Sequence, residues 1–214
     1  VVRIYVMNFL PQFISIATWF FMWIVWMGLP NYAFKKWKCT YHQYPFINTL
    51  WYITGITFWC IVYFPHLQQY FFAQANFSVV TLLLSLPILI FIPRYFHRDF
   101  FTPKERANYH FVKYFDVLCQ QVGFLCGLLT FWIGAFGFGM VFFLTHFLLI
   151  FFIPRNSALT FSGASLIGGL LFSFLHARGP VGFMVAFFIH RLFYIFLHAY
   201  YTKQSATNVS IHKR

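Results

Sequence analysis

The chain has 214 residues, of which 61% are apolar, 25% are aromatic and only 8% are charged. A soluble domain of this length would need far more charge on its exterior, so the composition excludes a soluble globular protein. Fifteen Lys and Arg residues against three acidic ones give a net charge of +12. The basic residues lie between apolar runs, where we expect them to set membrane topology and to meet anionic lipids, with no nucleic acid as a partner.

Apolar runs that approach the length of a membrane span recur along the whole chain. A spanning helix needs about 20 apolar residues, because the hydrocarbon layer is about 30 Å thick and each helical residue rises about 1.5 Å. The runs lie near residues 8–29, 46–65, 77–95, 114–134, 137–153, 158–176 and 181–201. They predict an all-α, polytopic transmembrane bundle of six or seven helices, the number depending on the short fifth run.

Glycine and proline divide these runs. We expect Gly28-Leu29-Pro30 to end the first helix, and Gly179-Pro180 to separate the last two helices. The chain is divided into three parts. Residues 1–40 hold an extra N-terminal transmembrane segment and a basic loop, residues 41–201 hold the transmembrane bundle, and 202–214 form a polar tail in water.

The basic residues also predict an orientation. If all seven runs span, twelve basic residues lie on one side and two on the other, with Arg191 inside the last helix. The richer side holds the loops 30–45 and 94–113, and we expect it to face the cytoplasm or the mitochondrial matrix. If the run 137–153 does not cross, the split weakens to nine against five.

Four histidines fall in or at the ends of apolar runs: His146, His176, His190 and His198. Membrane di-iron enzymes need histidine boxes, and no two histidines here are three or four residues apart. The stretch around His176, fourteen residues before His190, resembles a haem-ligand helix of cytochrome b. The Gly-Pro pair between the two should break that helix, so we expect no bound haem or metal.

The last helix carries a polar stripe. His190, Tyr194 and His198 recur every four residues beside Arg191. We expect Arg191 and His198 to extend towards opposite interfaces and the stripe to face a partner subunit. A functional site within the membrane is the alternative.

The run 114–134 begins with a charged residue. Asp116 is the only acid close to the membrane core, and Lys113 lies three residues before it, which favours a local ion pair at the interface over a proton relay. One turn further on, Gln120 and Gln121 need hydrogen-bond partners inside the membrane.

Two further patterns concern lipid and packing. Arg94, Arg98, Lys104 and Arg106 flank two spanning runs on the basic side. We expect them to bind an ordered phospholipid such as cardiolipin, phosphatidylethanolamine or phosphatidylglycerol. Small residues in Gly123-xxx-Gly127 and Ser165-xxx-Gly169 predict close helix packing. Because no nucleotide-binding loop, nucleophile elbow or metalloprotease motif occurs, the chain does not resemble an enzyme acting alone.

Short motifs from Tyr41 onward follow a recognisable order. They are Tyr41-His42-Gln43-Tyr44-Pro45, Trp51-Tyr52-Ile53-Thr54-Gly55, Phe96-His97-Arg98-Asp99, Thr102-Pro103, Lys113-Tyr114, Gln120-Gln121-Val122, Asn156-Ser157-Ala158-Leu159, Ser162-Gly163-Ala164-Ser165, Leu175-His176 and Leu197-His198-Ala199-Tyr200-Tyr201. In this order they resemble the motifs of cytochrome c oxidase subunit 3. No single motif is specific to that family.

The chain also departs from that family. Gln121 stands where the family has a buried glutamate, and Phe100 and Phe101 stand where it has paired histidines. The family's last two helices are missing, and residues 1–40 are extra. If the run 137–153 spans the membrane, everything after it is inverted relative to the family, and the resemblance then ends at Phe136.

The resemblance implies a non-catalytic core subunit of complex IV in the mitochondrial inner membrane, part of the respiratory chain. Such a subunit stabilises the haem-copper subunit 1, contacts other oxidase subunits, holds phospholipid and supports proton uptake, without binding a cofactor itself. The alternatives are a haem-b-binding membrane subunit of a quinone oxidoreductase and a small transporter. A transporter should keep several charges on an internal pathway, whereas here Arg191 is the only base inside a run.

Overall fold

The computed structural model of the chain describes residues 9–37, 43–72, 103–131, 133–151 and 155–211. The run 77–95 lies outside the described residues. Within the described part the elements are all helical, which confirms the predicted all-α fold. They are α1 Phe9–Trp23, η1 Ile24–Gly28, α2 Leu29–Trp37, α3 Pro45–Val62, α4 Phe64–Phe72, α6 Pro103–Thr130, α7 Gly134–Phe147, η2 Leu148–Phe151, α8 Arg155–His176 and α9 Pro180–Ile211.

The lengths of these helices fit a membrane. Three described helical stretches, Pro45–Val62, Lys104–Thr130 and Ala158–His176, are long and apolar enough to cross one. Shorter apolar stretches are Phe13–Gly28, Phe136–Phe147 and Pro180–Phe196. Together with the composition, they make the chain a helical membrane protein.

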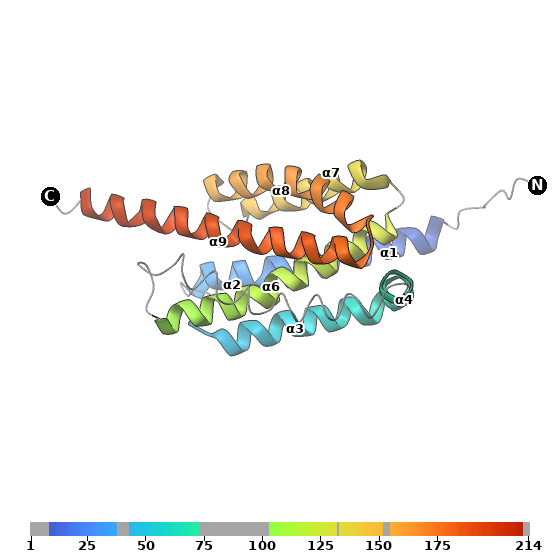
Figure 1. Cartoon of the computed structure of the whole chain (residues 1–214), viewed down its shortest axis with the longest axis horizontal. Coiled ribbons are helices and arrows are strands. Elements are labelled where there is room, and N and C mark those ends of the chain that lie inside the picture. The colour runs from blue at the N-terminus through green and yellow to red at the C-terminus, as the bar shows by residue number, and fades with distance from the viewer. Residues whose placement is uncertain (1–8, 38–42, 73–102, 132, 152–154, 212–214) are drawn as a thin grey trace, which may run out of the picture.

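The long helices lie along a common axis (Figure 1). The end of α2, the starts of α3, α6 and α8, and the C-terminal end of α9 gather at one end of the bundle. Lys36 near the end of α2, Lys104 at the start of α6 and Arg155 at the start of α8 are exposed there. We call this the basic end. Arg178, in the α8–α9 turn, is exposed at the opposite end, so the described residues agree with the predicted separation of charge.

The first helix does not end at Gly28-Leu29-Pro30, so that prediction was wrong. The backbone N–H of Leu29 donates to the Ile24 carbonyl in the π-helical turn η1, and the helix continues as α2. Pro30 has no N–H to donate to the carbonyl of Trp26. The indole of Trp51 on α3 donates to that carbonyl instead, at 3.3 Å. A tertiary hydrogen bond therefore compensates for the proline.

Two further segments that were predicted to be non-helical are helical in the structure. α6 begins at Pro103, so residues 103–113 of the predicted loop belong to the helix. Proline suits the first helical turn, and Glu105 there interacts favourably with the helix dipole. α9 continues to Ile211, through most of the predicted tail. No glycine or proline follows Gly182 to stop it.

Aromatic side chains join α1, α6 and α7. The indole of Trp19 on α1 donates to the Gly123 carbonyl on α6 at 2.7 Å, and its ring stacks on Trp23 at 5.3 Å. Phe124 on α6 contacts Phe138 and Phe142 of α7, with ring centroids 4.8 and 4.7 Å apart. The fifth apolar run is therefore part of the bundle core.

α7 also packs closely along α8. A Cβ built on Gly169 of α8 would lie 3.1 Å from the Gly139 carbonyl oxygen of α7, so the two backbones touch here. The predicted close packing at Ser165-xxx-Gly169 is thereby confirmed. α7 and α8 run in opposite directions (Figure 1), which returns the chain to the basic end before α8 begins.

Cysteine labelling of single variants tests whether α7 crosses the membrane. In a background without native cysteines, Lys104→Cys and Arg155→Cys should react from the same side and Arg178→Cys from the other, because α6 and α7 each cross once. An impermeant maleimide applied to sealed vesicles gives the measurement. Labelling of Arg155→Cys from the side opposite to Lys104→Cys would mean that α7 does not cross.

Gly127→Ala tests the aromatic core. The added Cβ would lie 2.6 Å from Trp19 Nε1 and closer still to the Phe138 ring, so the variant should lose about 1–3 kcal/mol of stability through overpacking. The matched control is Gly163→Ala on α8, where an added Cβ meets nothing within 4 Å. Unfolding in detergent should separate the two variants, and equal stability would contradict this packing.

Candidate intramembrane polar site

One face of α6 carries buried polar side chains at intervals of three or four residues: Arg106, His110, Lys113, Asp116 and Gln120. α9 packs against α6. The last three of these were predicted to need polar partners, but their connection with Arg106 and His110 was not predicted. The regular spacing was the signal that would have revealed the whole face.

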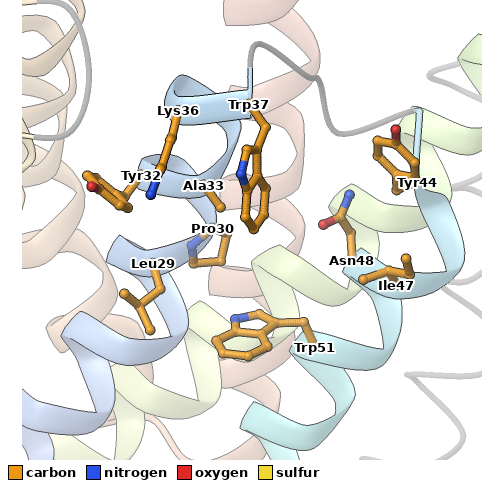
Figure 2. A pocket seen from close by; sticks show the side chains of 10 residues that line it. All are labelled: Leu29, Pro30, Tyr32, Ala33, Lys36, Trp37, Tyr44, Ile47, Asn48 and Trp51. Atoms are coloured by element: carbon orange, nitrogen blue, oxygen red, sulfur yellow. The ribbon is translucent and has the colours of Figure 1, made fainter.

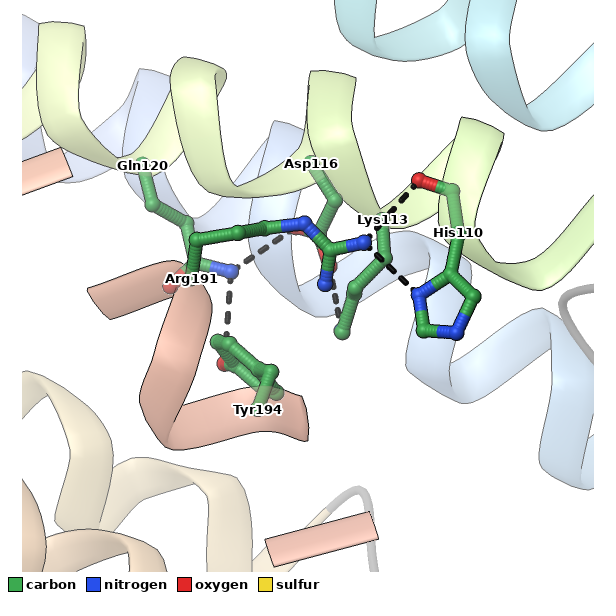
Figure 3. Close-up of polar contacts among 6 residues, drawn as sticks. All are labelled: His110, Lys113, Asp116, Gln120, Arg191 and Tyr194. Carbon is green, nitrogen blue, oxygen red and sulfur yellow. Dashed lines mark hydrogen bonds and ion pairs between the residues drawn. The ribbon is translucent and has the colours of Figure 1, made fainter. Parts of the chain in front are cut away.

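An ion pair lies at the centre of this face (Figure 3). Lys113 Nζ donates to Asp116 Oδ2 at 2.5 Å, and Gln120 Nε2 donates to Asp116 Oδ1 at 2.8 Å. From α9, Tyr194 places its hydroxyl 3.4 Å from Gln120 Nε2 and its ring 4.0 Å from the Lys113 ammonium. The predicted pair is confirmed, but it is buried between helices, where both charges depend on these contacts.

Arg191 of α9 is fully buried and extends along α6 towards His110 (Figure 3). Its Nη2 donates to His110 Nδ1 at 2.8 Å and to the His110 carbonyl at 3.3 Å. Because a guanidinium only donates, Nδ1 must accept, and His110 is held as the neutral imidazole with its proton on Nε2. The expectation that Arg191 extends to an interface was wrong.

We call this face of α6, together with Arg191 and Tyr194 of α9, the polar core. Positive charge exceeds negative charge in it. Arg106, Lys113 and Arg191 are buried, and Asp116 is the one buried carboxylate among the described residues. The Nε and Nη1 groups of Arg191 have no hydrogen-bond partner within the described chain. A buried guanidinium with unsatisfied donors is costly, which marks Arg191 as a functional candidate and not merely a packing residue.

A second cluster, which we call the glutamine bridge, joins three helices. Gln121 of α6 donates through Nε2 to His190 Nδ1 of α9 at 2.7 Å, and its Oε1 accepts from His176 Nε2 of α8 at 3.0 Å. The rings of Phe124 and Phe172 cover the two imidazoles, with centroids 5.3 and 5.1 Å away. The predicted need of Gln121 for partners is therefore met by two histidines.

This geometry confirms one prediction about the histidines and corrects another. α8 ends at His176, Gly179 turns with φ +79°, and α9 begins at Pro180, so the two histidines lie on separate helices as the Gly-Pro pair predicts. The cytochrome b arrangement, with both on one helix, is not present. His190 and Tyr194 face α6 and not a partner subunit, so that expectation was wrong.

The other predicted site residues are distributed differently. His198 lies on the α9 backbone, but its side chain lies outside the described residues, as do Arg94 and Arg98 entirely. Lys104 is exposed at the basic end, whereas Arg106 is buried, so the two side chains do not form one surface. The described residues hold no group of three or more His, Cys, Asp or Glu side chains suited to a metal ion.

No family model, curated protein or solved structure matches the chain. The class of the protein therefore rests on its fold and its buried polar residues. It is a helical membrane protein with polar side chains enclosed between α6, α8 and α9.

The ion pair can be tested with Asp116→Asn. This change leaves the buried Lys113 ammonium without its charge partner and should cost about 3 kcal/mol of stability. In the double variant Asp116→Asn/Lys113→Met no buried ammonium remains, so much of the loss should be recovered. Unfolding in detergent measures all three proteins, and a single variant as stable as the wild type would contradict the buried pair.

Proposed function

We propose that this chain is a non-catalytic membrane subunit of a respiratory complex in the mitochondrial inner membrane, similar in role to cytochrome c oxidase subunit 3. The observation that carries the proposal is that polar side chains lie inside the bundle and large apolar side chains lie on its surface. Polar side chains contact one another inside the chain, while the outer faces of α3 and α8 expose large apolar side chains such as Phe46, Ile61, Ile167 and Phe174. Such faces suit the helices of a catalytic neighbour and lipid.

The motif order between Tyr41 and Phe136 supports the same role. α7 lies inside the bundle, so α8 and α9 run opposite to their counterparts in that family, and the motifs after Phe136 no longer support the resemblance. The proposed neighbours are the haem-copper subunit 1 and other oxidase subunits. A phospholipid at Lys104, together with Arg94 and Arg98, belongs to this proposal.

A small transporter is the second candidate. The small number of charges within the apolar runs disfavoured a transporter, but Lys113, Asp116 and Arg191 are all buried inside one chain. Enclosed charges of this kind are typical of membrane proteins that move ions or protons. The polar core is the observation that favours this candidate. The haem-b alternative depended on two histidines along one helix and is not carried further.

Native electrophoresis with mass spectrometry separates the two candidates. The gently solubilised chain should migrate with haem-copper oxidase subunits, because the exposed apolar faces of α3 and α8 suit contacts with partner helices. A matched sample dissociated with a harsher detergent serves as the control. Migration as a free monomer, together with solute or proton flux in liposomes that Arg191→Leu abolishes, would reject the subunit role and support the transporter.

A further inference from the structure

A groove lies between α2 and α3 at the basic end (Figure 2), and no residue of the polar core lines it. It has a volume of about 620 Å³, within the range of small-molecule sites. Several lining side chains, among them Trp37, Tyr44 and Ile47, are exposed, so the groove opens on the outer surface of the bundle. The residues that line it are Leu29, Pro30, Tyr32, Ala33, Lys36, Trp37, Tyr44, Ile47, Asn48 and Trp51.

The floor of the groove is held in place by hydrogen bonds between the two helices. Trp26 Nε1 donates to the Trp51 carbonyl at 3.1 Å, and Trp51 Nε1 donates to the Trp26 carbonyl at 3.3 Å. Trp26 also packs on Gly55, where a Cβ would not fit. η1 packs against α3 at this point, and α2 beyond it stands apart from α3. The groove is thus a built feature of the π turn and not a gap left by poor packing.

The lining indicates the chemistry of the occupant. Lys36 is the one charged residue in it, and no acidic side chain lines the groove. The aromatic rings of Tyr32, Trp37 and Tyr44 are the kind that membrane proteins place at the level of lipid head groups. Below them, Leu29 and the Trp51 ring form an apolar floor, and Asn48 is the one amide side chain in the lining. A positive rim above an apolar floor complements a ligand with an anionic head and a hydrocarbon tail.

We propose that this groove is a binding site for one anionic phospholipid, with its phosphate at Lys36 Nζ and one acyl chain along Leu29 and Trp51. Lys36 lies at the end of the bundle where Lys104 and Arg155 are also exposed, which is the side where anionic head groups concentrate. The site requires that the chain lies in a bilayer, and it does not depend on the proposed respiratory role.

Native mass spectrometry of the full-length chain, with phosphatidylglycerol or phosphatidylcholine supplied in the micelle, tests this site. The wild type should retain one phosphatidylglycerol in preference to phosphatidylcholine. Lys36→Gln should lower that preference about five-fold, the effect expected of one lysine near an anionic surface. Ala33→Trp fills the groove and should displace either lipid, with its melting temperature checked against the wild type.

Arg155→Gln is the matched control, because it removes an exposed charge at the same end but outside the groove. It should bind phosphatidylglycerol as the wild type does. Equal loss in Lys36→Gln and Arg155→Gln would mean diffuse surface attraction and would overturn the site. Unchanged binding in Lys36→Gln would overturn it too, as would a folded Ala33→Trp that keeps its lipid. These outcomes are measured on the isolated chain, so they are independent of whether it assembles with oxidase subunits.

Discussion

The pairing of α6 with α9 is the constraint on which the rest of the structure depends. α6 carries Lys113 and Asp116 on a helix that is otherwise suited to a membrane, and exposing them to hydrocarbon would cost several kcal/mol each. The two charges neutralise one another, and α9 closes over them with Tyr194. α9 also contributes the Arg191 guanidinium, which donates a hydrogen bond to His110 of α6. Each helix therefore supplies the partners that allow the other to be buried.

The remaining helices are placed by contacts to other faces of α6. α1 is joined to it by the Trp19 indole at the Gly123 carbonyl, a close approach that glycine permits. α8 is joined to it by His176 at Gln121. At the opposite end from the basic residues, the Tyr70 hydroxyl of α4 lies 2.8 and 2.6 Å from the carbonyl oxygens of His176 and Gly179, which share its one proton. This contact ties the α8–α9 turn to the rest of the bundle. α6 is the central helix of the described chain.

A polar core of this kind has a bearing on function whichever role the chain plays. Polar groups enclosed by apolar helices are worth more to one another than they would be in water, and the same low dielectric makes the unsatisfied donors of Arg191 expensive. A supporting subunit and a transporter differ in whether this core stays closed. None of the residues that line the proposed lipid groove at Lys36 belongs to this core.

Some features were predictable because they follow from local chemistry. The apolar runs near 46–65 and 158–176 correspond to α3 and α8, since residues of that polarity have no stable place except a helix in lipid. Pro180 begins α9, as the predicted break at Gly179-Pro180 requires of a residue without an N–H. The i, i+3 pair of Lys113 and Asp116 was also readable, because both residues lie on one helical turn.

The sequence by itself determined the helical membrane class, the basic and less basic ends, and the need of Asp116 and Gln121 for polar partners. Only the tertiary structure decided which partners Gln121 and Arg191 have. His110 is 81 residues from Arg191, and Gln121 is 55 residues from His176 and 69 from His190. Likewise Pro30 was expected to end a helix, and a Trp51 indole from α3 allows it to continue. Helical periodicity determines which side chains share a face, but the choice of the opposing helix depends on packing over the whole bundle, which no local pattern contains.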